Sequence, residues 1–483
     1  MAGIGFELRK ISDKGGFFAK QKVYAYTSII YAGPLLLGIL LLATIAYLSV
    51  IGGLDNQDRN TLLGLISYST LFSLIFSSPF SFVLTRYVSD MLYEGKIKKI
   101  LPSFFASSVL MLAMGGIVYS LFLLFSGIAF FKLLLCLLLF GELTLIWNAL
   151  NYLTALKDYR NILLSFFIAI LATFLSGLVL VLLSVPYGLL VSACIGYGVM
   201  FLGLIWLLCL YFPNSLQPSF EFLTYFDRFG DLFEIGSYLF VGLFAHILMT
   251  WFSVLGERVD GLLRTAPVYD VPAMFAFLTT LVATVSFVVS VEVLFYPKFQ
   301  KYFNLYNENG NLLEIEQAEV EMLEVLQNEL KYLAWKQLMA TVLIMFLGNE
   351  LLSALPLGFN AQMRGFFQTL CLAYGLYGIG NANLLALLYF ADYQGAKQVT
   401  KYFAISSVLL TFILQFFSKD FYGFGFLIAS ILLFFTASRR LHAYTKDLSY
   451  HILGSQPILP VAKSGKFTLW AKQLDGKIGK EDL

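Results

Sequence analysis

Long apolar stretches are the feature of this sequence that most limits the folds open to it. A helix that crosses a bilayer needs about 20 mostly apolar residues, because its side chains face hydrocarbon. Twelve stretches of roughly this length follow one another along the chain, and the sequence therefore predicts an all-α polytopic membrane protein with about twelve transmembrane helices. They are residues 24–50, 61–85, 101–124, 131–152, 161–184, 187–212, 236–255, 271–294, 337–356, 368–391, 401–417 and 422–438.

The composition agrees with a membrane protein and argues against several other classes. Of the 483 residues, 59% are hydrophobic and 13% are charged, whereas an ordinary soluble domain is about 25% charged. No basic stripe with interleaved aromatic residues occurs outside the apolar stretches, so we expect no nucleic-acid partner. The cysteines lie inside apolar stretches without metal-ligand spacing, and we interpret them as small hydrophobic residues. They are Cys136, Cys194, Cys209 and Cys371.

The segments outside the membrane are too short for a typical catalytic domain. The longest are residues 295–336 and 439–483, and such a domain usually needs about 100 residues or more. A Walker-type loop ending in Lys-Ser or Lys-Thr is also absent. We therefore expect no enzyme activity, no metal and no cofactor. The energy for transport should come from an ion gradient, from synthesis of the substrate or from a partner protein.

The positions of Lys and Arg predict the orientation. Cytoplasmic loops carry an excess of these residues, and 26 of the 32 fall on the side that holds both termini. Both ends should therefore be cytoplasmic, which requires an even number of spans. The polar start is too long for a cleavable signal peptide, so the first helix should stay in the membrane.

The spans divide into two sets of six, and two like halves around a path are a common transporter plan. The predicted segments are a cytoplasmic N-terminal segment (1–23), an N-lobe (24–212), a cytoplasmic inter-lobe linker (213–235), a C-lobe (236–442) and a cytoplasmic C-terminal tail (443–483).

Several segments resemble the PelG family of Pel exopolysaccharide transporters. The opening decapeptide Met1–Lys10 is the most specific, and the Gly33-Pro34 helix follows it. Further matches are residues 261–270 (GLLRTAPVYD), 296–313 (YPKFQKYFNLYNENGNLL), 384–393 (LLALLYFADY) and 421–426 (FYGFGF), with Leu448-Ser449-Tyr450 beyond them. Together these segments extend over nearly the whole chain.

The resemblance implies a fold, a substrate and partners. The family belongs to the multidrug/oligosaccharidyl-lipid/polysaccharide (MOP) exporter superfamily, whose members have two six-helix lobes around a central cavity. It implies export of an amino-sugar polymer across the bacterial cytoplasmic membrane. The implied partners are a cytosolic glycosyltransferase and other membrane subunits of a Pel-type synthase complex.

Ionisable groups inside spans usually face a cavity or a partner, because lipid penalises them. Glu142 lies near the middle of the fourth span, and Asn148 and Asn151 follow it. These three residues could form a polar stripe along a substrate path. The alternative is that Glu142 is a packing residue hydrogen-bonded between helices.

Other candidates for the path lie near the span ends. Asp270 and Glu350 should lie toward the outer face, and Glu292 and Asp392 toward the inner face. Acids at several depths would suit a cationic or amino-sugar substrate, but acids at span ends also cap helices or contact water. Arg86 is expected to be an interfacial anchor, with pairing to an acid or a substrate phosphate as the alternative. His246 is expected to be a packed histidine.

The stretch from Glu308 to Glu329 holds seven glutamates and no Lys or Arg. Leucines at 323, 326, 330 and 333 have helical spacing, so residues 312–333 are predicted to form an amphipathic helix. The cytoplasmic leaflet is negative and should repel it. We therefore favour docking on protein, with Glu316, Glu319 and Glu324 available to a basic partner, over a free solvated helix.

Alternatives to a polymer exporter remain open. The same fold could serve a small-molecule antiporter or a flippase of lipid-linked oligosaccharides, because fold does not fix substrate. A membrane-embedded glycosyltransferase would need a catalytic domain that the chain lacks. A non-transporting scaffold subunit of a synthase complex is the third alternative.

Overall fold

The computed structural model describes residues 19–153, 159–212, 217–307, 310–354, 359–455 and 465–481. The decapeptide Met1–Lys10, most of the predicted N-terminal segment and Glu308 lie outside the described residues.

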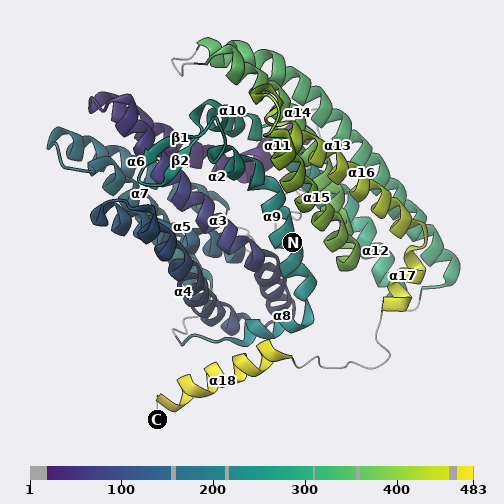
Figure 1. Cartoon of the computed structure of the whole chain (residues 1–483). Coiled ribbons are helices and arrows are strands. Elements are labelled where there is room, and N and C mark those ends of the chain that lie inside the picture. Colours follow the sequence, from purple (N-terminus) through teal and green to yellow (C-terminus); the bar gives the residue numbers. More distant parts are fainter. Residues whose placement is uncertain are drawn as a thin grey trace.

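The first half of the chain forms a bundle of long helices (Figure 1). Its helices are α2 (Ala19–Ile51), α3 (Asn56–Tyr93), α4 (Ile100–Ser126), α5 (Phe130–Leu153), α6 (Tyr159–Leu182) and α7 (Gly188–Tyr211). The short helix η1 (Ile97–Lys99) precedes α4, and η2 (Glu221–Leu223) and α8 (Thr224–Arg228) follow α7.

The second half forms another bundle and begins with α9 (Gly230–Trp251). The next span is divided into four consecutive helical segments. They are α10 (Pro267–Phe277), α11 (Thr280–Val289), the π-helical segment η3 (Ser290–Phe295) and α12 (Tyr296–Asn307). Then come α13 (Leu312–Ala354), α14 (Ala361–Tyr389), α15 (Tyr393–Leu414) and α16 (Phe424–Lys446), with η4 (Lys419–Phe421) before α16. The chain ends with α17 (Leu448–Ser455) and α18 (Lys466–Glu481).

Local chemistry sets several helix ends. The Asp55 carboxylate accepts the Asp58 N–H at 2.7 Å at the start of α3, and Asn360 accepts the Met363 N–H at 2.9 Å at the start of α14. Such side-chain caps satisfy N–H groups that have no partner within the helix. Gly127 ends α4 with a φ of 75°, a left-handed conformation that glycine adopts without a Cβ penalty.

The predicted fold class is confirmed. Ten helices among the described residues are long and apolar enough to span a bilayer, and α2 and α15 complete the twelve-span plan. One boundary differs from the prediction: residues 312–333 and the ninth span are a single 43-residue helix, α13. No Gly or Pro lies between 333 and 337, so nothing in the backbone interrupts helical hydrogen bonding there.

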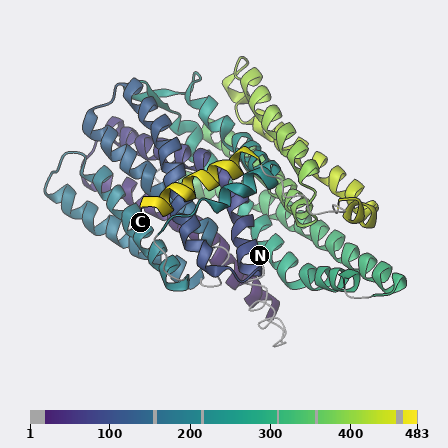
Figure 2. The same ribbon diagram turned by 90° about the horizontal axis from the view of Figure 1, so that it is seen from below.

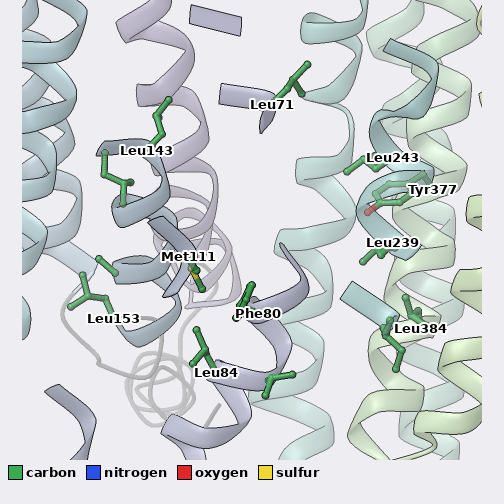
Figure 3. Packing of buried hydrophobic residues seen from close by; sticks show 14 of the residues in the cluster. Leu71, Phe80, Leu84, Met111, Leu143, Leu153, Leu239, Leu243, Tyr377 and Leu384 are labelled. Carbon is green, nitrogen blue, oxygen red and sulfur yellow. The ribbon is translucent and has the colours of Figure 1, made fainter. Parts of the chain in front are cut away.

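The two lobes meet along two helix pairs, α3 with α9 and α2 with α11. Gly236 in α9 permits the first contact, because a Cβ there would lie 2.7 Å from the Ser78 carbonyl oxygen of α3. Small residues commonly allow membrane helices to approach this closely. Figure 3 shows the apolar side chains around this interface, among them Phe80 of α3 and Leu239 of α9.

The two ends of the bundle carry different accessory elements (Figure 1). An antiparallel hairpin of β1 (Glu257–Asp260) and β2 (Leu263–Thr265) lies at one end, which we call the hairpin face. Helix α18 crosses the other end, below the N-lobe, which we call the linker face (Figure 2).

Asp227 of α8 anchors the start of α18. Its carboxylate accepts the Thr468 N–H and Oγ1–H, both at 2.7 Å, and the Gly465 N–H at 3.1 Å. Partial burial would raise the pKa of Asp227, but these hydrogen bonds outweigh it and hold the pKa below its ordinary value. The contact therefore favours the ionised carboxylate.

Candidate functional site

A cavity of about 870 Å³ lies in the seam between the lobes, where α2 meets α11, η3 and α13. We call it the seam crevice. Its wall on α11 and η3 is largely aliphatic, and most of its polar side chains come from α2 and α13. The lining residues are Val23, Tyr24, Ser28, Leu281, Val282, Val285, Ser286, Val289, Val293, Leu294, Glu329, Tyr332 and Lys336.

Two tyrosines hold the ammonium of Lys336 in the seam crevice. Lys336 Nζ donates to the Tyr24 hydroxyl at 2.6 Å. It also lies 4.5 Å from the Tyr24 ring centroid and 3.9 Å from that of Tyr332, which are cation–π distances. Glu329, on the same face of α13, accepts a hydrogen bond from the Ser290 hydroxyl at 2.5 Å. The crevice thus holds one basic and one acidic side chain.

The π-helical segment η3 forms part of this wall. Such segments add a residue to a helical turn and often occur at functional sites. Glu292 lies in η3 and is 5% exposed, but it does not line the seam crevice.

The structure does not bring the three polar side chains of α5, Glu142, Asn148 and Asn151, together on one side of the helix. Asn148 Nδ2 donates to Ser107 and Ser108 of α4, at 2.9 and 2.8 Å. Asn151 accepts from Ser81 of α3 at 2.7 Å. Glu142 instead faces α7, with Oε1 next to Gly198. The helical period explains this separation, because residues 6 and 9 positions apart lie roughly 120° and 180° from each other around the helix.

The boundary acids Asp270 and Asp392 have structural partners instead of facing the seam crevice. Asp270 accepts the Trp251 indole N–H at 2.9 Å and the Ala266 N–H at 3.1 Å, which closes the base of the hairpin. Asp392 forms a bidentate pair with Arg440, at 2.6 and 2.9 Å, and accepts the Gly395 N–H at the start of α15. These acids near helix ends thus cap helices and form hydrogen bonds or ion pairs with neighbouring segments.

The remaining candidates lie outside the crevice as well. Arg86 pairs with Asp90 one turn away at 3.1 Å and lies over the Phe229 ring at 5.3 Å. Glu350 is exposed near the hairpin-face end of α13. His246 is buried, with its two ring nitrogens 2.7 and 3.2 Å from the hydroxyls of Tyr269 and Tyr374.

The glutamates of α13 divide into two groups. Glu321 pairs with Lys298 and Lys301 of α12, and Glu319 accepts from Ser449 of α17 at 2.6 Å. Glu316 and Glu324 are exposed, and the described residues offer them no partner. Glu319 therefore already joins α13 to α17, and its contact with another protein stays a prediction.

Lys336 and Glu329 were missed as site residues. The predicted amphipathic helix ends at residue 333 and the predicted span begins at residue 337, so Lys336 lies between them. Residues 329, 332 and 336 are spaced by three and four, so they share one helix face. This spacing continues across the predicted boundary at residues 333–337, and it could have shown from the sequence that the three side chains are neighbours.

Solved structures with the same arrangement belong to one class of membrane transporter. An outward-facing multidrug resistance MATE family transporter of the MOP superfamily is 12% identical, with a TM-score of 0.57, covering 87% of this chain and 96% of its own. Its inward-facing counterpart is 13% identical, with a TM-score of 0.55 and coverages of 84% and 95%. A MOP superfamily transporter from Pyrococcus furiosus is 11% identical, with a TM-score of 0.56 and coverages of 88% and 95%. The chain therefore has the MOP transporter fold.

The family follows from the sequence. The model of the PelG family, described as "Putative exopolysaccharide Exporter (EPS-E)", matches residues 1–453. The chain belongs to the PelG family and is a multi-pass membrane exporter. No curated protein sequence matches it.

Proposed function

We propose that this protein exports an amino-sugar exopolysaccharide across the bacterial cytoplasmic membrane, without hydrolysing ATP itself. The observation that carries the proposal is the PelG family match over residues 1–453, on a chain folded as two lobes with a cavity at their seam. A cytosolic glycosyltransferase would supply the polymer, and other membrane subunits of the synthase would complete the complex.

We assign the linker face to the cytosol. Of the 32 Lys and Arg residues, 26 fall on the side of the predicted spans that includes this face. Bacterial membrane proteins keep such residues inside. In this orientation α18 and the α12–α13 hairpin would be cytosolic, and the β1–β2 hairpin would face outward.

Within the first lobe, we propose Glu142 as a group that takes up a proton or a substrate amine. Its Oε2 atom is buried without a hydrogen-bond donor among the described residues. We expect Glu142→Gln to keep the wild-type melting temperature and to reduce export, because the variant loses charge without losing a described contact. Asn148→Ala, in the same helix, should melt earlier, because it loses hydrogen bonds worth about 1–3 kcal/mol. Normal export by Glu142→Gln would make Glu142 a packing residue.

A gene deletion separates this proposal from its alternatives. Removing the transporter gene should abolish secretion of amino-sugar polymer, and the wild-type gene should restore it. Removing the glycosyltransferase should also abolish polymer export. A small-molecule antiporter would keep its transport without the glycosyltransferase and would need an ion gradient. Normal polymer secretion by the transporter deletion would refute the proposal.

The exposed tip of α13 is our proposed docking site for a basic cytosolic partner. Leu312, Leu313 and Val320 are 73%, 64% and 64% exposed, and Glu316 and Glu324 lie on the same segment. Figure 2 shows the α12–α13 hairpin extending away from the rest of the bundle. Apolar side chains within a charged rim are typical of protein interfaces.

The double variant Glu316→Lys, Glu324→Lys should lose co-purification of the glycosyltransferase and most polymer secretion, because reversed charges repel a basic partner. The matched control is Glu257→Lys, Asp420→Lys, which reverses two exposed acids on the hairpin face. The control should behave as wild type. Equal co-purification by both double variants would eliminate this docking site.

A further inference from the structure

The seam crevice has the height of one membrane leaflet. Its wall runs from Leu281 to Leu294 along α11 and η3, which at 1.5 Å per residue is roughly 20 Å. The hydrocarbon core of a bilayer is about 30 Å thick, so one leaflet with part of its headgroup layer is about as tall as this wall. The wall is aliphatic apart from Ser286 and therefore suits an acyl chain more than a hydrated sugar.

The mouth of the seam crevice is apolar and exposed. Leu294 and Tyr332 line the crevice, and yet they are 44% and 58% exposed. On α13, Trp335 and Met339 beside the crevice are 68% and 65% exposed. Exposed apolar side chains on a spanning helix face lipid. The crevice is therefore reached sideways from the bilayer.

The two charged side chains follow the order of groups in one kind of lipid. Glu329 and Lys336 are two turns apart on α13, about 10 Å along the axis. Glu329 lies nearer the linker face, and Lys336 lies next to the apolar part of α13. In a glycerophospholipid with an amine headgroup, the phosphate is bonded to the glycerol that carries the acyl chains, and the ammonium projects beyond the phosphate. Lys336 can thus meet the phosphate while Glu329 meets the ammonium.

We infer that the seam crevice binds an aminophospholipid of the phosphatidylethanolamine type from the leaflet on the linker face, the cytoplasmic leaflet in the orientation proposed above. An acyl chain lies against the α11–η3 wall. The Lys336 ammonium, which lies against the rings of Tyr24 and Tyr332, binds the lipid phosphate. The Glu329 carboxylate binds the lipid ammonium. The inference concerns lipid binding and holds whatever the protein exports.

Lipid retention by the full-length protein tests this inference. The protein is purified from vesicles of equal phosphatidylethanolamine and phosphatidylglycerol, and the bound lipids are counted by native mass spectrometry. Wild type should retain phosphatidylethanolamine preferentially. Lys336→Gln should retain about tenfold less of both lipids, since one charge-assisted hydrogen bond to phosphate is lost. Glu329→Gln should bind the two lipids equally.

Matched variants control for folding and surface charge. Lys331→Gln and Glu350→Gln remove the same charges from exposed positions of α13 that do not line the crevice, and they should retain both lipids as wild type does. Val285→Trp should fill the crevice and displace the lipid without changing a charge. Preference of the wild type for phosphatidylglycerol, or unchanged retention by both Lys336→Gln and Val285→Trp, would overturn the inference. Either result would leave the export proposal standing.

Discussion

Gly261→Val is expected to detach the β1–β2 hairpin from the first lobe. Gly261 has a φ of 54°, and a Cβ there would collide with the Ser126 carbonyl oxygen at the end of α4. That oxygen also accepts the Leu262 N–H at 2.8 Å, and the neighbouring Asp260 pairs with Lys132 of α5 at 2.6 Å. A side chain at residue 261 would therefore strain the backbone and separate both contacts.

Gly53→Val is the matched control for Gly261→Val. Gly53 is also on the hairpin face, with a φ of 68°, but open space surrounds its Cβ position. Valine there should cost only backbone strain, about 1–3 kcal/mol. Gly261→Val should cost about 2 kcal/mol more, from the lost hydrogen bond and ion pair. Thermal melting of the two purified variants compares them, and equal melting temperatures would contradict the hairpin contact.

Asp392→Ala is expected to destabilise the second lobe by about 3 kcal/mol, because it breaks a buried ion pair and removes a helix cap. The Asp392 side chain is 4% exposed and binds two nitrogens of Arg440. Arg440 is 37% exposed, so water can partly solvate its guanidinium after the change. The effect should therefore lie at the lower end of the range for buried pairs.

Glu94→Ala is the comparison for Asp392→Ala. Glu94 and Lys96 form a pair at 2.6 Å with side chains 43% and 52% exposed. Solvent-exposed pairs contribute little, so this variant should melt as wild type does. If Asp392→Ala and Glu94→Ala melt together, the Asp392–Arg440 pair does not support the lobe as described.

Hydropathy was sufficient to predict the architecture, since the need to bury backbone polar groups in lipid leaves a helix as the simplest conformation of each apolar stretch. It could not predict that α13 is continuous. The end of an apolar stretch marks the boundary between lipid and water, not the end of a helix. A helix with Glu and Leu on opposite faces can continue from lipid into water without a break. The acidic segment and the ninth span therefore form one continuous helix.

The site was harder to predict than the fold, because an acid near a span end has the same sequence signature whether it caps a helix or lines a path. Asp270 and Asp392 have partners at residues 251 and 440, and such distant contacts are set by the lobe fold. The seam crevice likewise joins residues 24, 285 and 336 from three helices. Within α13, Glu329, Tyr332 and Lys336 share a local spacing that the sequence displays.

Polymer translocation into inverted membrane vesicles tests the central claim most directly. In these vesicles the cytosolic face is outward, so added glycosyltransferase and radiolabelled nucleotide-activated amino sugar reach the proposed entry side. Vesicles that contain the transporter and the other synthase subunits should accumulate labelled polymer in the lumen, protected from an external glycosidase. Vesicles that lack only the transporter should make polymer that stays outside and is digested. Equal protected polymer in both preparations would contradict the assignment of this protein as the exporter.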